Sequence, residues 1–413
     1  MTGSLTVIGV SAHTVLAEQA REALAGADLV IGGQANLDLM ERDLIEPAVE
    51  VETIVLGPLT PALDRLRAHQ LAAGHAVVVA SGDPGFFGIV RSLRAAGLDC
   101  RVLPAVGSVS AAFAMAGLDW DGAVVVSAHG RELGPALNAC RAQARVAVLT
   151  GPGAGPVEIA RGLAGWPREL LIAERLGLAG ERITRASAVE VAARQPSEFA
   201  DPNVVLSLAV EADPALSTEM RRDNQPAAAP ASGWALAESA YEHRDSMITK
   251  AEVRAWVVAR LRPSLGRLIL DVGAGSGSVG IECALLGAAV VAVERDAEAA
   301  AMIARNAARH GVRLRVVVGP APDVLAGLPE ADAAFVGGGG TDVVQDLARR
   351  RVRLVVAAFA ALDRALAAHE ILSAAGYRVE GVQLGASRLT GLPGGSLRLA
   401  ATNPVLVLTG VLG

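Results

Sequence analysis

A glycine-rich segment in the second half of the chain constrains the fold more than any other feature. Residues 271–282 read DVGAGSGSVGIE, follow the apolar run Leu268-Ile269-Leu270, and precede a second apolar run that ends at Glu294. This order predicts a strand, a glycine loop, a helix and a second strand with an acid at its end. Such a loop lets backbone amides approach a ligand at a helix N-terminus. The segment therefore predicts a nucleoside-cofactor site in an α/β fold.

Two cofactors compete for this loop. Residues 275–280 match the dinucleotide pattern G-x-G-x-x-G, and Glu294 lies about 20 residues further on, as that pattern requires. However, Asp271 stands at the strand end, where a dinucleotide site is normally apolar and a carboxylate can receive the ammonium group of S-adenosylmethionine. Glu294 would accept hydrogen bonds from the ribose. The residues favour S-adenosylmethionine over NAD, and the expected cofactor-binding residues are Asp271, Gly273, Gly275, Gly277, Glu294 and Ala321, the last in a turn placed against the adenine.

Composition limits the remaining choices. The chain has 413 residues, of which 52% are hydrophobic and 3% aromatic, and its net charge is −6. This length predicts two or more domains, while the acidic balance and scarce aromatics argue against nucleic acid as a partner. Residues 1–47 contain no signal peptide pattern, and no stretch is long and apolar enough to span a membrane. We therefore expect a soluble, cytoplasmic protein, and its three scattered cysteines predict no metal site.

The chain is predicted to divide at a proline-bearing segment. Residues 211–238 combine three prolines with charged and small residues and lack periodicity, which is typical of a linker. We expect domains at 1–212 and 238–413, joined by a linker at 213–237. Beyond the linker, strands and helices alternate and end with an adjacent pair of strands at 377–384 and 404–409. This pattern predicts a doubly wound, mostly parallel sheet.

The first half also reads as α/β, with chemistry-bearing turns after its apolar strands. A strand ending near Ala80 runs into Ser81-Gly82-Asp83-Pro84-Gly85-Phe86-Phe87-Gly88, and a later strand leads into Gly107-Ser108-Val109-Ser110. Such turns place backbone groups and one carboxylate at a sheet edge. By spacing alone, the simpler interpretation is that Asp83 only caps a helix beginning near Gly88.

Taken together, these motifs resemble known families. The first half resembles the tetrapyrrole methylases, through 81–88 and 107–110, and the second half resembles a class I methyltransferase, through 247–250, 271–282, 294–296 and 335–338. Their order resembles the fused decarboxylating precorrin methylases of aerobic cobalamin synthesis. The resemblance implies S-adenosylmethionine as methyl donor for both halves and a precorrin as substrate. It implies methylation of carbon 5 by the first half, and methylation of carbon 15 with loss of the ring C acetate carboxyl by the second.

Residue roles follow from the resemblance. Cofactor-binding residues of the first half would be Ser81, Gly82, Asp83, Phe87 and Ser108, and substrate-binding residues of the second half would be Thr249, Lys250, Gly337 and Gly338. Lys250 is the only lysine in the chain, and it is either a candidate catalytic residue or a surface lysine that persists by chance. Arg244, Arg254, Arg388 and Arg398 are either contacts for substrate carboxylates or, more simply, solvated surface charges.

One departure from the family pattern affects the first half. Its first loop, usually G-x-G-P-G, reads Gly9-Val10-Ser11-Ala12-His13 here. Alternatives to the main interpretation are a nicotinamide-dependent reductase and a tetrapyrrole-binding carrier in which only the second half is active. We also expect the protein to form a homo-oligomer.

Overall fold

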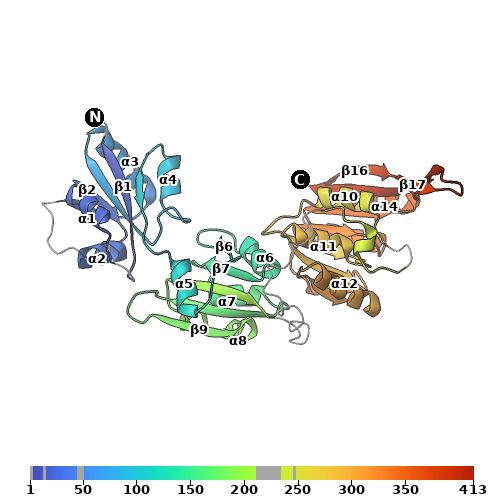
Figure 1. The fold of residues 1–413 in the computed structure, drawn as a ribbon, viewed down its shortest axis with the longest axis horizontal. Coiled ribbons are helices and arrows are strands. Elements are labelled where there is room, and N and C mark those ends of the chain that lie inside the picture. The colour runs from blue at the N-terminus through green and yellow to red at the C-terminus, as the bar shows by residue number, and fades with distance from the viewer. Residues whose placement is uncertain (1–2, 13–14, 44–50, 211–233, 245–247) are drawn as a thin grey trace. The chain divides into compact units, whose positions relative to one another are not determined.

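A computed structural model of the chain describes residues 3–12, 15–43, 51–210, 234–244 and 248–413. Its strands form three main sheets and one hairpin (Figure 1). The chain forms two compact units: the first comprises 1–131, 147–160 and 169–207, and the second 132–146, 161–168 and 208–413. Most of the expected linker lies outside the described residues. The domain boundaries expected from the sequence therefore stay a prediction.

The first sheet is fully parallel and has the strand order β3-β2-β4-β1-β5. Its strands are β1 (Ser4–Val10), β2 (Leu29–Gly32), β3 (Glu52–Val55), β4 (His75–Ser81) and β5 (Arg101–Leu103), and its helices are α1 (Glu18–Ala25), α2 (Gln34–Asp43), α3 (Leu59–Leu71) and α4 (Val90–Ala95). Successive residues of β1 pack into different apolar clusters, Val7 into one and Ile8 into the other, so both faces of the sheet are buried. Because the strands are parallel, their carboxyl ends all lie at the same edge of the sheet.

The second sheet has the order β6-β7-β10-β8-β9 and carries an antiparallel β8–β9 pair. Its elements are α5 (Ser108–Ala116), β6 (Val124–Ser127), α6 (Gly134–Ala142), β7 (Arg145–Leu149), α7 (Pro156–Gly162), β8 (Arg168–Glu174), β9 (Arg182–Ser187), α8 (Ala188–Ala192), the short helix η1 (Pro196–Glu198) and β10 (Asn203–Ala209). The Glu174 carboxylate is buried, and its two oxygens accept hydrogen bonds from Nε and Nη2 of Arg182, each at 2.8 Å. These bonds tie β8 to β9.

The third sheet confirms the predicted doubly wound fold. Seven strands run in the order β13-β12-β11-β14-β15-β19-β16, and only β19 is antiparallel to its neighbours. The strands are β11 (Leu268–Val272), β12 (Ala289–Glu294), β13 (Arg315–Val318), β14 (Ala333–Val336), β15 (Leu354–Phe359), β16 (Tyr377–Leu384) and β19 (Val405–Leu412). The helices are α10 (Ala251–Leu261), α11 (Ser278–Leu285), α12 (Ala297–Arg309), α13 (Thr341–Arg349) and α14 (Leu362–Ala374), with short helices η2 (Glu238–Ala240) and η3 (Asp323–Gly327). Chain order reverses between β11 and β14, which is where such sheets bind ligands.

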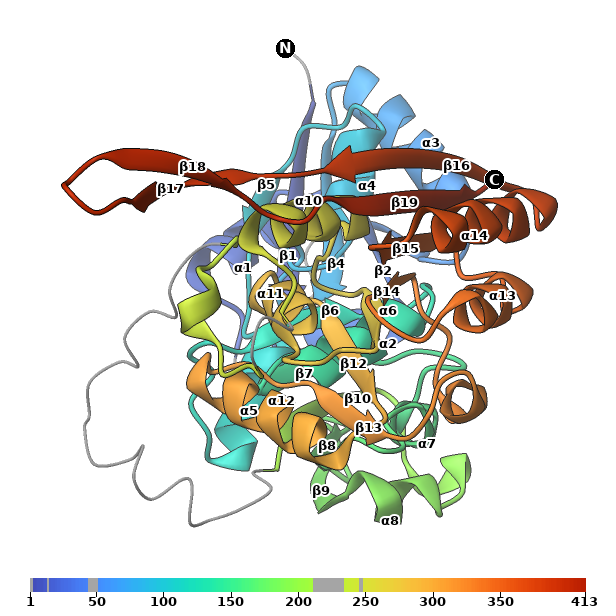
Figure 2. The same cartoon turned by 90° about the vertical axis from the view of Figure 1, so that its right-hand side faces the viewer.

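Two strands lie outside this sheet and were not expected from the sequence. β17 (Ser387–Gly391) and β18 (Leu397–Ala401) form an antiparallel hairpin that continues outward from β16 and β19 (Figure 2). Thr402 and Ala386 close its base: the Thr402 amide donates to the Ala386 carbonyl at 2.8 Å, and the Ala386 amide donates to Thr402 Oγ1 at 3.2 Å. The turn is Leu392-Pro393-Gly394-Gly395-Ser396, in which Gly394 and Gly395 have positive φ.

Candidate active site

The carboxyl group of Asp271 is buried at the end of the central strand β11. Asp271 is 1% exposed, and its Oδ2 accepts a hydrogen bond from the Gly280 amide of α11 at 2.8 Å. Its Oδ1 is also buried and has no hydrogen-bond partner in the described part of the chain. Burial raises the pKa of Asp271 to about 7, against the Gly280 hydrogen bond, which lowers it, and with the charge of Glu294, which raises it further. A buried acceptor without a partner fits the ammonium group of S-adenosylmethionine.

The glycine loop adopts a conformation that suits glycine. Gly273, Gly275 and Gly277 have φ angles of +71°, +56° and +74°, a region that other residues adopt at a cost. A Cβ on Gly273 would lie 2.7 Å from the backbone of Gly338, whereas one on Gly275 would meet nothing within 4 Å. The loop therefore packs against the end of β14 on one side and is open at Gly275 on the other.

Glu294 lies beside this opening, at the end of β12. Its Oε2 accepts a hydrogen bond from the Gly275 amide at 2.9 Å and its Oε1 one from the Asp296 amide at 3.1 Å. A carboxylate has about four acceptor positions, so two amides leave capacity for ribose hydroxyls. The Gly319 amide donates to the Glu294 carbonyl at 3.0 Å, which brings the turn that contains Ala321 to the same edge. The structure thus places Glu294, Gly275 and this turn together.

The predicted substrate glycines lie next to the loop. The Gly337 amide donates to the Val272 carbonyl at 3.0 Å, and a Cβ on Gly337 would lie 2.8 Å from the Phe335 ring. A Cβ on Gly338 would reach Gly273 at 3.5 Å, an ordinary contact, and Gly338 does not have positive φ. Gly338 therefore faces the glycine loop, and its backbone conformation is one that a residue with a side chain can also adopt.

Thr249 and Lys250 lie just before α10, where Lys250 is the N-cap residue. The Thr249 carbonyl accepts a hydrogen bond from Arg254 Nη1 at 2.6 Å, and the Lys250 carbonyl accepts one from the Arg254 amide at 2.8 Å. Within the described residues, the Lys250 ammonium makes no ion pair, and no hydrogen bond joins Thr249 or Lys250 to the glycine loop. Met247, which belongs to the same sequence motif, lies outside the described residues.

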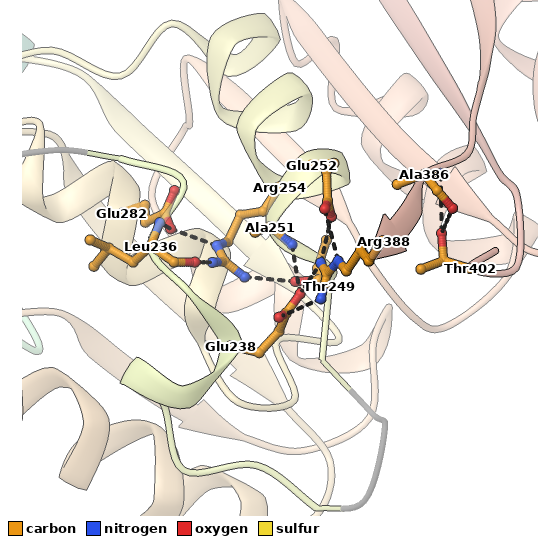
Figure 3. A network of polar contacts seen from close by, with 10 residues as sticks. All are labelled: Leu236, Glu238, Thr249, Ala251, Glu252, Arg254, Glu282, Ala386, Arg388 and Thr402. Atoms are coloured by element: carbon orange, nitrogen blue, oxygen red, sulfur yellow. Dashed lines mark hydrogen bonds and ion pairs between the residues drawn. The ribbon is translucent and has the colours of Figure 1, made fainter. Parts of the chain in front are cut away.

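The expectation for Arg254 is wrong on both alternatives. Arg254 is fully buried, and its Nε donates to Glu282 at 2.6 Å while Nη2 donates to the Leu236 carbonyl (Figure 3). A buried arginine needs such partners because an unpaired charge inside a protein is costly. Arg254 is therefore neither a substrate contact nor a solvated charge.

The other three arginines stay closer to the surface. Arg244 pairs with Glu298 and reaches Asp296 at 3.5 Å, while Arg388 is held between Glu238 and Glu252. Arg398 is exposed on β18. Arg388 and Arg244 are thus paired charges rather than free ones.

Two buried polar residues with structural roles were missed in the sequence. Glu282, 0% exposed, accepts hydrogen bonds from the amides of Ala235 and Leu236 at 2.9 and 3.0 Å and from the Tyr241 hydroxyl at 3.1 Å. Asn306 bonds the backbone of Glu242 and donates to the carbonyl of Ser276 in the glycine loop at 2.9 Å. We call residues 234–242 the strap, because these bonds tie this segment to α11 and, through Asn306, to the glycine loop. A lone acid in the apolar helix SVGIECAL was the signal for Glu282.

Three loops converge at the carboxyl edge of the first sheet. The Gly82 amide donates to the Val10 carbonyl at 2.8 Å, and the Ala105 amide donates to the Gly82 carbonyl at 3.0 Å. A Cβ on Gly9 would lie 2.0 Å from the Gly82 carbonyl oxygen, so glycine is required there. A Cβ on Gly82 would lie 3.1 Å from Gly107 Cα and 3.6 Å from the amide nitrogen of Ser108. The turn at 81–88 and the loop at 107–110 are therefore neighbours, as one site requires.

The aromatic turn differs from a simple helix cap. Asp83 Oδ1 accepts a hydrogen bond from the Gly85 amide at 2.8 Å, and α4 begins at Val90 without a side-chain cap, so the capping interpretation is wrong. Phe87 has φ +54°, and the Arg131 guanidinium lies 5.3 Å from its ring centroid. Ser81 Oγ donates to Asn36 Oδ1 at 2.7 Å. His13 of the unusual first loop lies outside the described residues.

Each half of the chain matches a different family model. Residues 7–192 match the Tetrapyrrole (Corrin/Porphyrin) Methylases, and residues 239–392 match the Precorrin methyltransferase domain. A precorrin-6Y C(5,15)-methyltransferase [decarboxylating] from Sinorhizobium sp is 38% identical over 351 residues, which are 82% of this chain and 79% of the relative. The chain belongs to the family of decarboxylating precorrin-6Y C(5,15)-methyltransferases.

Further relatives agree with this membership. A precorrin-6Y C(5,15)-methyltransferase [decarboxylating] from Mycobacterium tuberculosis is 31% identical over 81% of this chain and 80% of its own length. A protein of Pyrobaculum calidifontis, named a probable cobalt-precorrin-6B C(15)-methyltransferase (decarboxylating), is 40% identical over 39% of this chain and 87% of its own length. Like other members of the family, the chain is a C-methyltransferase that also decarboxylates. Among the described helices, none is long and apolar enough to cross a membrane.

Proposed function

We propose that the chain transfers methyl groups from S-adenosylmethionine to carbons 5 and 15 of a precorrin and removes the ring C acetate carboxyl, converting precorrin-6B to precorrin-8X. The observation that carries this proposal is Asp271: a buried carboxylate with an acceptor atom that lacks a partner, at the switch point of a doubly wound sheet. A nicotinamide cofactor has no ammonium group to fill that position. When bound, S-adenosylmethionine supplies an electrophilic methyl group.

The residues of the second unit divide the work of binding. Asp271 would hold the amino group of the cofactor and Glu294 its ribose, while the open side of Gly275 would allow close approach of the backbone. Gly337 and Gly338 would leave room for the macrocycle, and Thr249 and Lys250 would meet its carboxylates. Holding the ring carbon in line with the methyl group would supply much of the rate enhancement.

Decarboxylation makes a different demand on the site. The bond between the acetate methylene and its carboxyl carbon breaks, carbon dioxide leaves, and the electron pair passes into the conjugated ring before a proton from solvent replaces the carboxyl. The chain would orient the acetate and exclude water from it, and Lys250 would direct the carboxylate. A relative that matches only 39% of the chain is named for carbon 15 and decarboxylation alone, which supports assigning both steps to one unit.

Glycine substitutions test this assignment. Gly338→Val should fill the space beside Gly273 and stop methylation of carbon 15 and decarboxylation, while Gly82→Val should crowd Gly107 and stop methylation of carbon 5. Gly327→Val is the control, because a Cβ there would meet nothing within 4 Å. The mass of the product from precorrin-6B reports each step separately. Loss of carbon dioxide release in Gly82→Val, with release intact in Gly338→Val, would reverse the assignment.

A further inference from the structure

One arginine of the hairpin holds two carboxylates beside Lys250. Arg388 donates from Nη1 and Nη2 to Glu238 at 3.0 and 2.8 Å, and from Nε and Nη2 to Glu252 at 2.9 and 2.6 Å (Figure 3). We call Arg388, Glu238 and Glu252 the clamp. It joins β17 to η2 of the strap and to the first turn of α10, across 150 and 136 residues of chain respectively. The clamp therefore fixes a place where three separate elements meet.

The clamp engages every oxygen of both carboxylates. Each oxygen of Glu238 and Glu252 receives at least one bond from the guanidinium, and Oε1 of Glu238 also accepts the Ala251 amide at 3.0 Å. Bonds from Arg388 hold the pKa of Glu238 at about 2 and lower the pKa of Glu252, so both groups stay ionised at neutral pH. Bidentate arginine–carboxylate bonds are directional, and they commit these charges to Arg388.

The backbone around Lys250 is bonded to this arrangement, while the Lys250 ammonium takes no part in it within the described residues. Its flanking backbone is fixed on both sides, because Thr249 offers its carbonyl to Arg254 and Ala251 offers its amide to Glu238. Glu252 is two residues away in sequence, and Glu238 contacts the residue that follows Lys250. In the described part of the chain, Lys250 nevertheless pairs with neither carboxylate. Without Arg388, the carboxylate bonded to the following residue and the one two residues along the chain would both be released to compete for the ammonium.

We propose that Arg388 is a positioning residue that keeps the Lys250 ammonium available to a carboxylate of the substrate, by holding Glu238 and Glu252 away from it. This inference rests on the proposed function, in which the substrate carries several carboxylates. The clamp does not touch the substrate. Its effect on turnover passes through Lys250, so the two residues should be energetically coupled.

A double-mutant cycle on the 413-residue chain tests this coupling. Lys250→Met and Arg388→Met should each raise the KM for precorrin-6B about 10-fold or more, the size of one charge-assisted hydrogen bond. The double variant should be no worse than Lys250→Met alone. Adding Glu238→Gln and Glu252→Gln to Arg388→Met should return KM toward the wild-type value, because no carboxylate then competes for the ammonium. Arg378→Met, an exposed arginine of β16, controls for loss of one surface charge.

Several outcomes would overturn the inference. Independent, multiplicative effects of Lys250→Met and Arg388→Met would show that Arg388 does not act through Lys250. A KM that stays high after both glutamates are replaced would show that Arg388 itself binds the substrate. If Arg388→Met fails to fold, Arg388→Lys takes its place in the cycle, because lysine keeps the charge but not the fork. A wild-type chain that binds S-adenosylmethionine but leaves precorrin-6B unchanged would instead refute the proposed function, and with it this inference.

Discussion

The proposed role of Asp271 combines burial with ligand binding at a single residue, and it predicts that cofactor affinity depends on pH. Its pKa of about 7 means that the ligand-free site is protonated below pH 7 and ionised above it. An ammonium group binds the ionised form. The affinity for S-adenosylmethionine should therefore be highest between about pH 7 and pH 8. Below pH 7 the Kd should rise by up to about tenfold per pH unit, because binding must release a proton, and above about pH 8 it should rise again as the α-amino group of the cofactor loses its charge.

Calorimetry at several pH values checks this dependence, with proton release read from buffers of different ionisation enthalpy. Asp271→Asn is the necessary control. It should bind weakly and show a flat profile. A wild-type Kd that does not change between pH 6 and pH 8 would contradict the role of Asp271.

Glu294→Gln tests the second polar contact of the cofactor. The neutral amide offers one acceptor oxygen in place of two, so the ribose and the amides of Gly275 and Asp296 would compete for it. We expect S-adenosylmethionine to bind about 1.5–3 kcal/mol more weakly, the cost of losing a hydrogen bond to a charged group. Equal affinity of both proteins in calorimetry would refute the assignment.

At the residue scale, the sequence predicted those residues whose backbone conformation is set by the spacing of their neighbours. Gly273, Gly275 and Gly277 were predictable because their spacing specifies a turn with positive φ. Arg254 was not, because its partners Glu282 and Leu236 lie 28 and 18 residues away and only the fold brings them together. Pairing between distant side chains leaves no local pattern to detect.

The strap is the element whose removal has the clearest expected effect. A chain beginning at Gly233 keeps Ala235, Leu236 and Tyr241, whereas one beginning at Arg244 leaves Glu282 without three of its donors. Buried acceptors without partners cost about 1–3 kcal/mol each, and more for charged groups. The shorter chain should therefore unfold at a clearly lower urea concentration and bind S-adenosylmethionine more weakly.

Tyr241→Phe in the longer chain provides a graded comparison, because it removes only the hydroxyl donor to Glu282. The urea midpoint of Tyr241→Phe should lie between the midpoints of the two unsubstituted chains. Equal urea midpoints for the chains beginning at 233 and 244 would show that the strap does not stabilise the fold of residues 244–413.

Elements were predictable where apolar runs are buried on both faces. β11 and β12 appear in the sequence as Leu268-Ile269-Leu270 and the run before Glu294, and both fill the core. The β17–β18 hairpin was missed because its leucines are exposed, Leu389 at 70% and Leu399 at 67%, so no contrast of buried and exposed residues marks it. Its turn residues, Pro393 to Gly395, were the signal that remained.

At the scale of the whole molecule, the sequence predicted two α/β halves, and one family model matches within each, at 7–192 and 239–392. In the proposed function both halves act on one substrate. The central claim is therefore that one chain adds two methyl groups and removes one carboxyl group.

Mass spectrometry of precorrin-6B after incubation with the 413-residue chain and S-adenosylmethionine tests this claim most directly. The account predicts one product that has gained two methyl groups and lost one molecule of carbon dioxide, with two equivalents of S-adenosylhomocysteine formed. Methyl groups from a labelled donor should appear twice in that product. A product that retains the carboxyl group, or an unchanged substrate with the cofactor bound, would contradict the account.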